Sequence, residues 1–423
     1  AKINEVLKFA IENEYSDFYR KKYRDSVKLP VTSFEDFQKI PFLEKSELLE
    51  TRVSERTFVE DSDVSYFSFS SGTTKSPLPL IMPRMQEEYN SDDLMLQELG
   101  VSRIVVLLQP TSSLFKKALL TKNNSIKKIA GNIQNLHMTA KIMQELNVDG
   151  VMTTPTVLNS LLTELISINF DLSQIKWVSI GSEFCSSLNY NFLRSQFENA
   201  YFRMRYGSSE TGGGLHYRCK YLAESGLPNV FHINTNKELI EVLDENGIPI
   251  DFGDFGEFVH TDLFSKPAPL IRYKMSDIGS LEKKQCPCGN DITLTIGGKK
   301  DLDVMKLHGA TIYAELIRSS LEKVRDVIEP FFQMHVFEKI QDSKPKPQLI
   351  LQLKLRQKYE NENKNEIFVE ILKEKISSNL KLSANQTLTD FVQRGLFLPL
   401  EIEFVSAWKK DNFKTKNIIS HLK

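Results

Sequence analysis

The chain has 423 residues, of which 41% are apolar and 26% are charged, so it has the composition of a globular protein and the length of two or three domains. Its 54 basic and 55 acidic residues give a net charge of −1, which argues against general electrostatic attraction to nucleic acid or to anionic lipid. No run of about 18 apolar residues suggests a membrane span, and the N-terminus lacks the pattern of a signal peptide, so a cytoplasmic protein is expected.

The first 60 residues are predicted to be helical and polar. Residues 1–26 have the pattern of an amphipathic helix, and one helix is expected to end at Pro41 and another to begin near Ser46. From Val64 to about Ile296, short apolar runs alternate with stretches of helical periodicity, which predicts an α/β fold with a mostly parallel sheet covered on both faces. The expected strands lie within 102–110, 150–155 and 175–181, and the expected helices within 139–147, 155–168 and 187–199.

The pattern changes near residue 238. Residues 238–263 contain strand-like runs around an Asn-Gly turn and further glycines, which predicts an antiparallel or barrel-like subdomain. Residues 296–310 are charged and glycine-rich and are interpreted as a linker. A small α+β unit is expected beyond them. Its helices are predicted at 311–324 and 365–380, and its strands at 330–340, 347–355 and 400–408.

The first candidate for a chemical role is the loop FSFSSGTTKSPLPL at residues 67–80. Small hydroxylated residues around a glycine allow backbone N–H and side-chain O–H groups to converge on phosphate oxygens. The spacing of a Walker loop is absent, so the loop taken alone fits an ordinary surface turn equally well. The residues expected to bind phosphate are Ser70, Ser71, Gly72, Thr73 and Thr74.

Two carboxylates and a basic segment are further candidates. Glu210 lies among small residues in RMRYGSSETGGG, where it can hold a magnesium ion or cap a helix. Asp277 in LIRYKMSDIG can accept hydrogen bonds from both hydroxyls of a ribose, or simply form a turn before glycine. The C-terminal segment KKDNFKTKNIISHLK offers a lysine to a carboxylate or phosphate, although taken alone it reads as a solvated tail.

Taken together and in this order, these segments resemble the adenylate-forming superfamily, and within it the phenylacetate–CoA ligases and their capsule-biosynthesis relatives. The segment SSGTTKSP is similar to the family's phosphate loop, VSIGSEF to its adenine-side strand, and YGSSETG and RYKMSDIG to its two acidic motifs. The segment GGKKDLDVMKLHGATIY resembles the interdomain hinge, and FKTKNI resembles the terminal catalytic lysine motif. The segments SDFYRKKYRDS and FEDFQKIPFLEKSELLE are similar to the N-terminus of that branch, so the resemblance covers nearly the whole chain.

The resemblance implies a domain organisation and a role for each matched residue. An adenylation domain is expected at 1–297, a hinge at 298–305 and a mobile C-terminal domain at 306–423. The hydroxylated loop would cradle the β- and γ-phosphates of ATP, Glu210 would bind Mg²⁺ and Asp277 would hold the ribose. Lys414 is the expected catalytic lysine, with Lys416 as the alternative. The other residues expected along the nucleotide are Gly181, Ser182, Glu183, Tyr206, Gly207, Ser208 and Lys299.

The chain departs from the family pattern at two of these motifs. The phosphate loop has Lys75-Ser76 where the family has Gly-Lys, which stiffens the loop or moves its positive charge. The hinge has one residue more than the family's Gly-Arg-x-Asp-Asp. Lys299 or Lys300 therefore replaces the arginine, and Asp301 or Asp303 is the pivot.

The four cysteines point to a metal site rather than to disulfides in a cytosolic protein. Zinc takes four nitrogen or sulfur ligands in a tetrahedron. Sequences of the resembled branch suggest a structural zinc site in a subdomain at about 212–296, with His216 as a reserve ligand; the alternative is a set of unligated thiols. Cys185 is expected to be a small core residue. The expected zinc ligands are Cys219, His232, Cys286 and Cys288.

The activity implied by the resemblance is ATP-dependent conversion of a carboxylic acid to an acyl-adenylate, followed by transfer to coenzyme A or to the phosphopantetheine of an acyl-carrier protein. An aromatic acid is the first choice, with a fatty acid or an amino acid as alternatives, and an amine, a hydroxyl or a protein as alternative acceptors. The acid is expected near Gln109-Pro110, Asn135–His137 and Gly207-Ser208. A homodimer is a further expectation. The rival hypotheses are a non-catalytic nucleotide-binding relative and a zinc hydrolase, which four protein ligands would disfavour.

Overall fold

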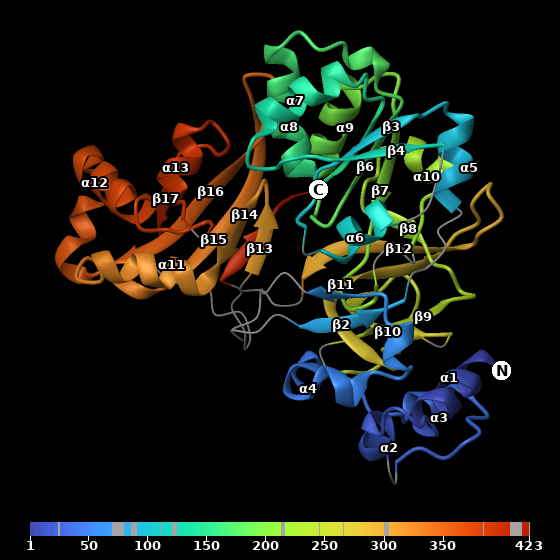
Figure 1. The fold of residues 1–423 in the computed structure, drawn as a ribbon. Coiled ribbons are helices and arrows are strands. Elements are labelled where there is room, and N and C mark those ends of the chain that lie inside the picture. The colour runs from blue at the N-terminus through green and yellow to red at the C-terminus, as the bar shows by residue number, and fades with distance from the viewer. Residues whose placement is uncertain are drawn as a thin grey trace. The chain divides into compact units, whose positions relative to one another are not determined.

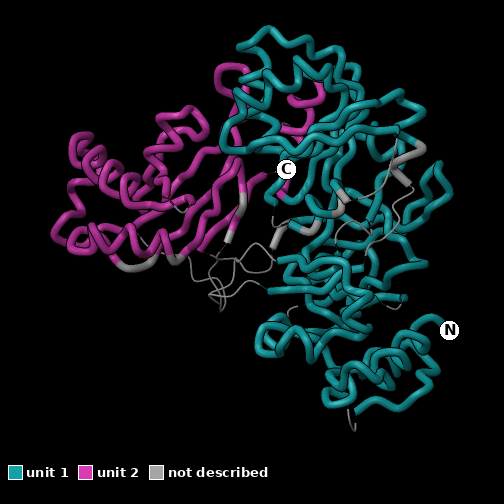
Figure 2. The backbone as a smooth tube through the Cα atoms, viewed as in Figure 1, with its two compact units in different colours: residues 1–182, 196–297 teal, residues 183–195, 298–423 magenta. Residues whose placement is uncertain are grey.

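In the computed structural model, the chain forms two compact units (Figures 1 and 2). The first contains residues 1–182 and 196–297, and the second contains residues 183–195 and 298–423. Among the described residues, no helix is long and apolar enough to cross a membrane. The described residues are 1–23, 26–69, 80–85, 91–110, 112–120, 125–212, 216–244, 246–264, 266–299, 304–383, 385–406 and 417–422.

The first unit contains a five-stranded parallel sheet in the order β4-β3-β5-β6-β7, which confirms the predicted α/β class. Alternate strand residues such as Ile104 and Trp177 form a core with the apolar sides of α5 and α6, while α8 contacts β6 and α7 packs on α8. The strands are β3 (Arg103–Val106), β4 (Lys127–Ala130), β5 (Gly150–Thr153), β6 (Trp177–Gly181) and β7 (Tyr201–Arg205). The helices are α5 (Ser91–Glu98), α6 (Ser113–Leu120), α7 (Leu136–Glu145), α8 (Pro155–Ser167) and the short η3 (Leu172–Gln174).

A second, five-stranded sheet has the order β8-β12-β11-β10-β9, and its β8–β12, β9–β10 and β10–β11 pairs are antiparallel, as predicted for this region. A separate antiparallel pair joins β1 to β2. The strands are β1 (Tyr66–Phe69), β2 (Ile81–Arg84), β8 (Val230–His232), β9 (Glu238–Leu243), β10 (Phe255–Asp262), β11 (Tyr273–Lys283) and β12 (Ile292–Lys299). The short helix α10 (Lys220–Glu224) precedes β8.

The N-terminal helices pack on this antiparallel sheet, where Leu7 and Phe37 share a core with Phe258. The single helix predicted over residues 1–26 is wrong. The side chain of Asn13 accepts hydrogen bonds from the backbone N–H groups of Tyr15 and Ser16, and this local bonding turns the chain between two helices. The helices are α1 (Lys2–Ile11), α2 (Phe18–Tyr23), α3 (Phe34–Gln38) and α4 (Lys45–Glu50), followed by η1 (Val53–Arg56) and η2 (Asp61–Asp63).

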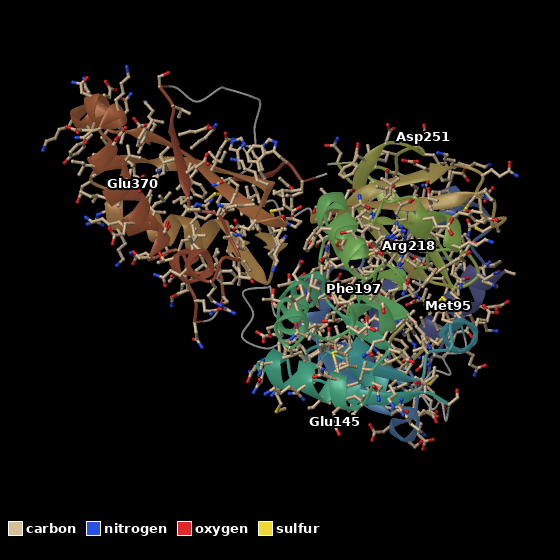
Figure 3. The ribbon with its side chains drawn as sticks, turned by 90° about the horizontal axis from the view of Figure 1, so that it is seen from above. Met95, Glu145, Phe197, Arg218, Asp251 and Glu370 are labelled. Carbon is tan, nitrogen blue, oxygen red and sulfur yellow. The ribbon has the colours of Figure 1, made fainter. Side chains whose placement is uncertain are left out.

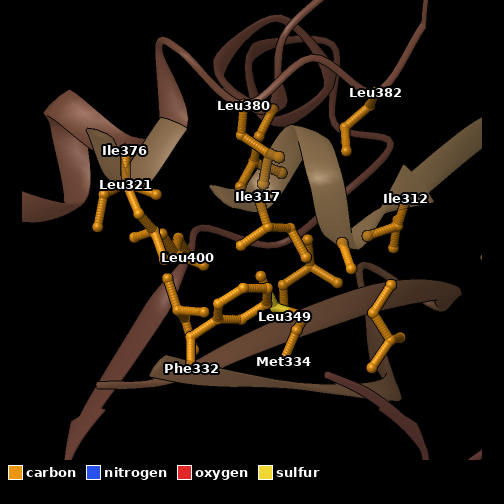
Figure 4. Close-up of a cluster of buried hydrophobic side chains, with 14 of the residues drawn as sticks. Ile312, Ile317, Leu321, Phe332, Met334, Leu349, Ile376, Leu380, Leu382 and Leu400 are labelled. Atoms are coloured by element: carbon orange, nitrogen blue, oxygen red, sulfur yellow. The ribbon is translucent and has the colours of Figure 1, made fainter. Parts of the chain in front are cut away.

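The second unit contains a mixed sheet in the order β17-β16-β15-β18, covered by helices whose apolar residues meet it in one core (Figure 4). Phe332 and Leu349 of the sheet pack against Ile317 and Ile376 of the helices in this core. The strands are β15 (Ile328–Gln341), β16 (Lys344–Leu355), β17 (Glu401–Phe404) and β18 (Ile418–Ser420). The helices around this core are α11 (Ala314–Leu321), η4 (Glu322–Val324), η5 (Gln357–Lys364), α12 (Glu366–Ser377) and α13 (Leu388–Gln393). Most of α9 (Ser187–Gln196) also belongs to this unit, but none of its described residues belongs to the core.

Interpreting residues 296–310 as a linker was wrong at both ends. Residues 296–299 complete β12, and β13 (Val304–Leu307) pairs with β14 (Ala310–Tyr313). The turn between them has φ values of +46° at His308 and +77° at Gly309, which are the conformations of a tight hairpin. The helix predicted from residue 311 therefore begins only at Ala314.

Candidate active site

The carboxyl ends of β6 and β7 bring together the first predicted site residues. Gly181 pairs with Arg205, and a Cβ atom at Gly181 would lie 2.6 Å from the Arg205 carbonyl oxygen, so only glycine permits this approach. Ser182 follows Gly181 with a φ of +67°, and Tyr206 follows Arg205. Ligands of open α/β sheets bind at this edge. Glu183, predicted for the same motif, is the next residue and the first of the second unit.

Residues 207–212, which we call the Glu210 turn, follow β7. The backbone N–H of Thr211 donates to Ser208 Oγ at 3.2 Å, and the Ser208 N–H donates to Thr211 Oγ1 at 3.3 Å, so the turn is closed by its own side chains. Gly212 ends the turn with a φ of +85°, a conformation that favours glycine. The small residues of this motif thus give a sharp turn that fixes the backbone around Glu210.

Arg84 at the end of β2 connects the Glu210 turn to the β1–β2 pair. Its Nη2 donates to the Glu210 carbonyl oxygen at 2.9 Å and to the Ser209 carbonyl oxygen, and its Nε donates to Ser68 Oγ of β1 at 3.2 Å. The predicted phosphate loop joins these two strands, because Phe69 pairs with Ile81. The base of that loop is therefore next to the turn that carries the predicted magnesium ligand.

The Glu210 carboxylate is buried and paired with groups that the sequence analysis did not identify. Lys45 Nζ lies 3.0 Å from Glu210 Oε1, and the Tyr273 hydroxyl donates to the same oxygen at 3.4 Å. Lys45 is held there by Leu43, whose N–H donates to the Arg272 carbonyl at 2.9 Å beside β11. Burial and the Glu210 charge raise the pKa of Tyr273. Both Lys45 and Tyr273 lie in segments that carried the family resemblance.

Asp277 is positioned by an irregularity in β11. The register between β10 and β11 shifts opposite Glu257 and Val259, and Ser276 has a φ of +58°, so the strand bulges one residue before Asp277. The Tyr206 hydroxyl donates to Asp277 Oδ2 at 3.0 Å. Burial, and then the Asp277 charge, raise the pKa of Tyr206, so its hydroxyl remains a donor. Tyr206, predicted to lie along the nucleotide, and Asp277, predicted to hold the ribose, are therefore in direct contact.

Several predicted residues cannot be placed in this arrangement. Lys299 is the last residue of β12, and its side chain is outside the described part of the chain. Of the residues suggested for the acid, Asn135 caps α7 and the His137 ring pairs with Glu164 at 3.0 Å. Outside the described residues lie Ser70, Ser71, Gly72, Thr73, Thr74, Lys75, Ser76, Lys300, Asp301, Asp303, Lys414 and Lys416.

Comparison with solved structures finds this fold in 2-hydroxyisobutyryl-CoA ligase in complex with 2-HIB-AMP and CoA in the thioesterification state. The TM-score is 0.62 and the identity 16%, over 99% of this chain and 88% of the ligase chain. The same ligase in the postadenylation state with 2-HIB-AMP gives a TM-score of 0.58 at 16% identity, over the same shares of the two chains. The protein has the fold of the adenylate-forming enzymes. No protein-family model and no curated protein matches the chain.

The region around the antiparallel sheet also brings together the four predicted zinc ligands. The ligand atoms of Cys219, His232, Cys286 and Cys288 all lie within 4.8 Å of one another. The two sulfurs of Cys219 and Cys286 are 3.6 Å apart, and Cys288 Sγ is 3.3 Å from His232 Nε2. Tetrahedral ligands at ~2.3 Å from zinc would lie ~3.8 Å apart, so the donor set has the size of a zinc site.

Three separate elements supply these donors. Cys219 caps α10, His232 ends β8, and Cys286 and Cys288 lie in the turn between β11 and β12. The neighbouring Arg218, labelled in Figure 3, is buried, and its Nη2 donates to the Leu227 carbonyl at 2.8 Å, which secures the loop after α10.

The hydrogen bonds around the four donors also suit a metal. His232 Nδ1 lies 3.1 Å from the Ile292 carbonyl, which leaves Nε2 free to bind a metal. Burial raises the pKa of the Cys219 thiol to about 11, so a bound cation would have to displace its proton. The reserve ligand His216 is not part of this group; its ring packs against Tyr206 with the centroids 4.8 Å apart.

Proposed function

We propose that the protein activates a carboxylic acid with ATP, releases pyrophosphate, and transfers the acyl group from the acyl-adenylate to a thiol such as coenzyme A or a carrier-protein phosphopantetheine. The observation that carries this proposal is the position of Glu210, next to the base of the β1–β2 loop and close to the Tyr206–Asp277 pair. The shared fold supports it, because the 2-hydroxyisobutyryl-CoA ligase structure contains an acyl-adenylate and CoA.

The reaction overcomes the poor leaving group of a carboxylic acid. A carboxylate oxygen attacks the α-phosphorus of ATP, the bond from that phosphorus to the bridging oxygen breaks, and pyrophosphate leaves. A thiolate then attacks the acyl carbonyl carbon, and AMP leaves with the oxygen that the carboxylate contributed. The protein supplies position and charge rather than covalent chemistry.

The residues of the first unit have distinct roles in this proposal. Asp277, oriented by Tyr206, accepts hydrogen bonds from the ribose hydroxyls, and Ser70–Thr74 surround the outer phosphates. Glu210 fits a magnesium ligand, because its buried carboxylate already faces the ammonium of Lys45. Magnesium would neutralise phosphate charge there. The resemblance assigns the catalytic lysine to Lys414 and makes the second unit the mobile domain.

A substrate panel identifies the carboxylic acid and the acyl acceptor. Pyrophosphate release is measured with a panel of aromatic, short hydroxy, fatty and amino acids, and the products are identified by mass spectrometry with and without coenzyme A. An acid-dependent release with an acyl-CoA product supports the full proposal. An amide or ester product moves the acceptor to an amine or a hydroxyl. Binding of MgATP without release for any acid would instead indicate a non-catalytic nucleotide-binding protein.

We further propose that Cys219, His232, Cys286 and Cys288 hold a structural zinc ion. The proposal is supported by the compact donor set and by the Ile292 carbonyl behind His232. Four protein ligands complete the usual tetrahedron, so this ion would connect α10, β8 and the β11–β12 turn and take no part in the reaction.

A further inference from the structure

Five buried polar side chains form a continuous series beneath the Glu210 turn. The series runs from His216 through Glu238, His260 and Asp262 to Lys266, and none of the five residues is more than 6% exposed. His216 Nε2 and His260 Nδ1 each lie 3.4 Å from Glu238 Oε2, His260 Nε2 lies 3.0 Å from Asp262 Oδ1, and Lys266 Nζ lies 2.8 Å from Asp262 Oδ1. We call these residues the buried charge chain.

The register of the antiparallel sheet explains how the buried charge chain forms. Asp262 of β10 pairs directly with Glu238 of β9, so their side chains lie on the same face of the sheet. His260 precedes Asp262 by two residues and therefore shares that face. Two carboxylates directly opposite each other destabilise a sheet unless a cation lies between them. His260 is the cation between them, and Lys266 pairs with the same Asp262 oxygen at the end of the series.

The protonation states follow from the contacts. His260 faces a carboxylate through each ring nitrogen, so a neutral ring would turn a lone pair toward one of them. Burial lowers the pKa of His260, but the charges of Asp262 and Glu238 outweigh burial and raise it. For His216, burial is the larger effect and lowers the pKa, so the ring is neutral. An imidazolium and an ammonium thus balance the two carboxylates.

Each end of the buried charge chain contacts a residue of the proposed active site. Lys266 Nζ donates to the carbonyl oxygen of Thr211, the residue after Glu210, at 3.3 Å. At the other end, the His216 ring packs on the Tyr206 ring with centroids 4.8 Å apart, and Tyr206 donates to Asp277. The buried charge chain therefore supports the proposed magnesium ligand at one end and the proposed ribose ligand at the other.

We propose that the buried charge chain is a positioning unit for nucleotide binding, in which Lys266 holds the Glu210 turn and His216 supports the Tyr206–Asp277 pair. The inference rests on the proposed function, since it assigns a role to residues behind that site. Buried ions are costly, and apolar side chains of similar volume are often at least as stable, so this arrangement is explained better by positioning than by stability.

The test measures binding of MgATP and of AMP by calorimetric titration of the full chain. For Lys266→Met, the dissociation constant of MgATP is expected to rise about 10-fold, because loss of such a supporting contact typically costs 10-fold or more. AMP lacks the outer phosphates and their metal, so its dissociation constant should change less than about 3-fold. Lys266→Arg keeps the charge and should recover most of the MgATP affinity.

The matched control is Lys346→Met, which removes a largely buried lysine paired with Asp342 at 2.9 Å in the second unit and should leave both affinities unchanged. If Lys266→Met does not fold, the same titrations are made with Lys266→Gln, and their result tests the positioning role. Equal MgATP affinities in the wild type and the folded variant would overturn the positioning role alone. Absence of MgATP binding in the wild type would instead contradict the proposed function.

Discussion

The Nζ atom of Lys45 lies 3.0 Å from the Oε1 atom of Glu210, so the carboxylate that we assign to magnesium is neutralised by a lysine from α4. Arg84 and Lys266 bind the backbone of the same turn through the carbonyls of residues 209–211. Cations from three parts of the first unit thus hold the side chain and the backbone of one short turn.

Lys45 and a metal ion should compete for the same carboxylate oxygen. Lys45→Met leaves a buried carboxylate without its cation and is expected to lower the free energy of unfolding by about 1–3 kcal/mol in the absence of ligand. With saturating MgATP the loss should shrink, because a metal ion replaces the missing charge. Chemical denaturation with and without MgATP measures both values.

The control for this experiment is Lys274→Met, which removes an ion pair to Glu44 at 2.8 Å nearby without touching Glu210. Its effect should be independent of MgATP. A Lys45→Met loss of the same size with and without MgATP would show that this lysine and the metal do not share a site.

Asp277 should give the protein a preference for a ribose sugar. Replacement by asparagine removes the charged acceptor, and loss of a hydrogen bond to a charged group corresponds to about 10-fold or more in KM for ATP. The wild type should use ATP better than 2′-deoxy-ATP, and Asp277→Asn should lose most of that difference. Asp244→Asn changes an aspartate in the turn after β9 and serves as the control. An unchanged preference in Asp277→Asn would place the ribose elsewhere.

A bound zinc ion should be measurable in the purified protein. Metal analysis is expected to give about one zinc per chain by the four-ligand rule. Cys286→Ser and Cys288→Ser should each lose most of that zinc and be less stable, whereas Cys185→Ser should keep it, because Cys185 lies outside the donor group. Protein that contains no zinc after purification, and that gains no stability when zinc is added, would rule this site out.

The buried charge chain predicts a pH dependence of stability that can be assigned to His260. Glu238 of β9 and Asp262 of its own strand face the ring, and they hold its pKa above the ordinary value of about 6.5. The stabilisation is therefore complete below about pH 6.5 and is lost as the pH rises through the raised pKa. The stability difference between wild type and His260→Gln should be largest near pH 6 and shrink toward pH 9.

His421→Gln is the comparison, because burial and His335 lower the pKa of His421. That depressed pKa destabilises the wild type as the pH falls below about 6.5. The stability difference between the wild type and His421→Gln should therefore change with pH in the opposite direction to the difference for His260→Gln. Parallel pH profiles for the two variants, measured by denaturation from pH 6 to 9, would contradict the assignment.

Local patterns in the sequence predicted those parts of the fold that depend on neighbouring residues. The alternation of apolar runs with helical stretches gave β3, β5, β6, α7 and α8 close to their observed positions. The turn at His308 and Gly309 was missed, because glycine and charge are common both to linkers and to tight hairpins. The break at Asn13 was missed because apolar residues recur at helical spacing both before and after it, as Val6 and Ala10 do in α1 and Tyr19 and Tyr23 do in α2.

The candidate site was predictable as a set of motifs but not as a set of contacts. The resemblance assigned Glu210, Tyr206 and Asp277 to one site, and the structure adds Lys45 and Tyr273 as partners of Glu210. Lys45 lies far from Glu210 in the sequence and reaches it only because Leu43 pairs beside β11. Nothing local distinguishes such a lysine from a solvated one, so long-range pairing of this kind appears only in three dimensions.

The most direct test of the account is exchange of labelled pyrophosphate into ATP, which reports formation of the acyl-adenylate alone. The exchange should require an acid from the panel, and Glu210→Gln and Lys414→Ala should each reduce it at least about 100-fold while the proteins stay folded, as expected for groups that stabilise the charged transition state. Lys416→Ala should retain most of the activity. Wild-type protein that binds MgATP but supports no exchange with any acid would contradict the central claim.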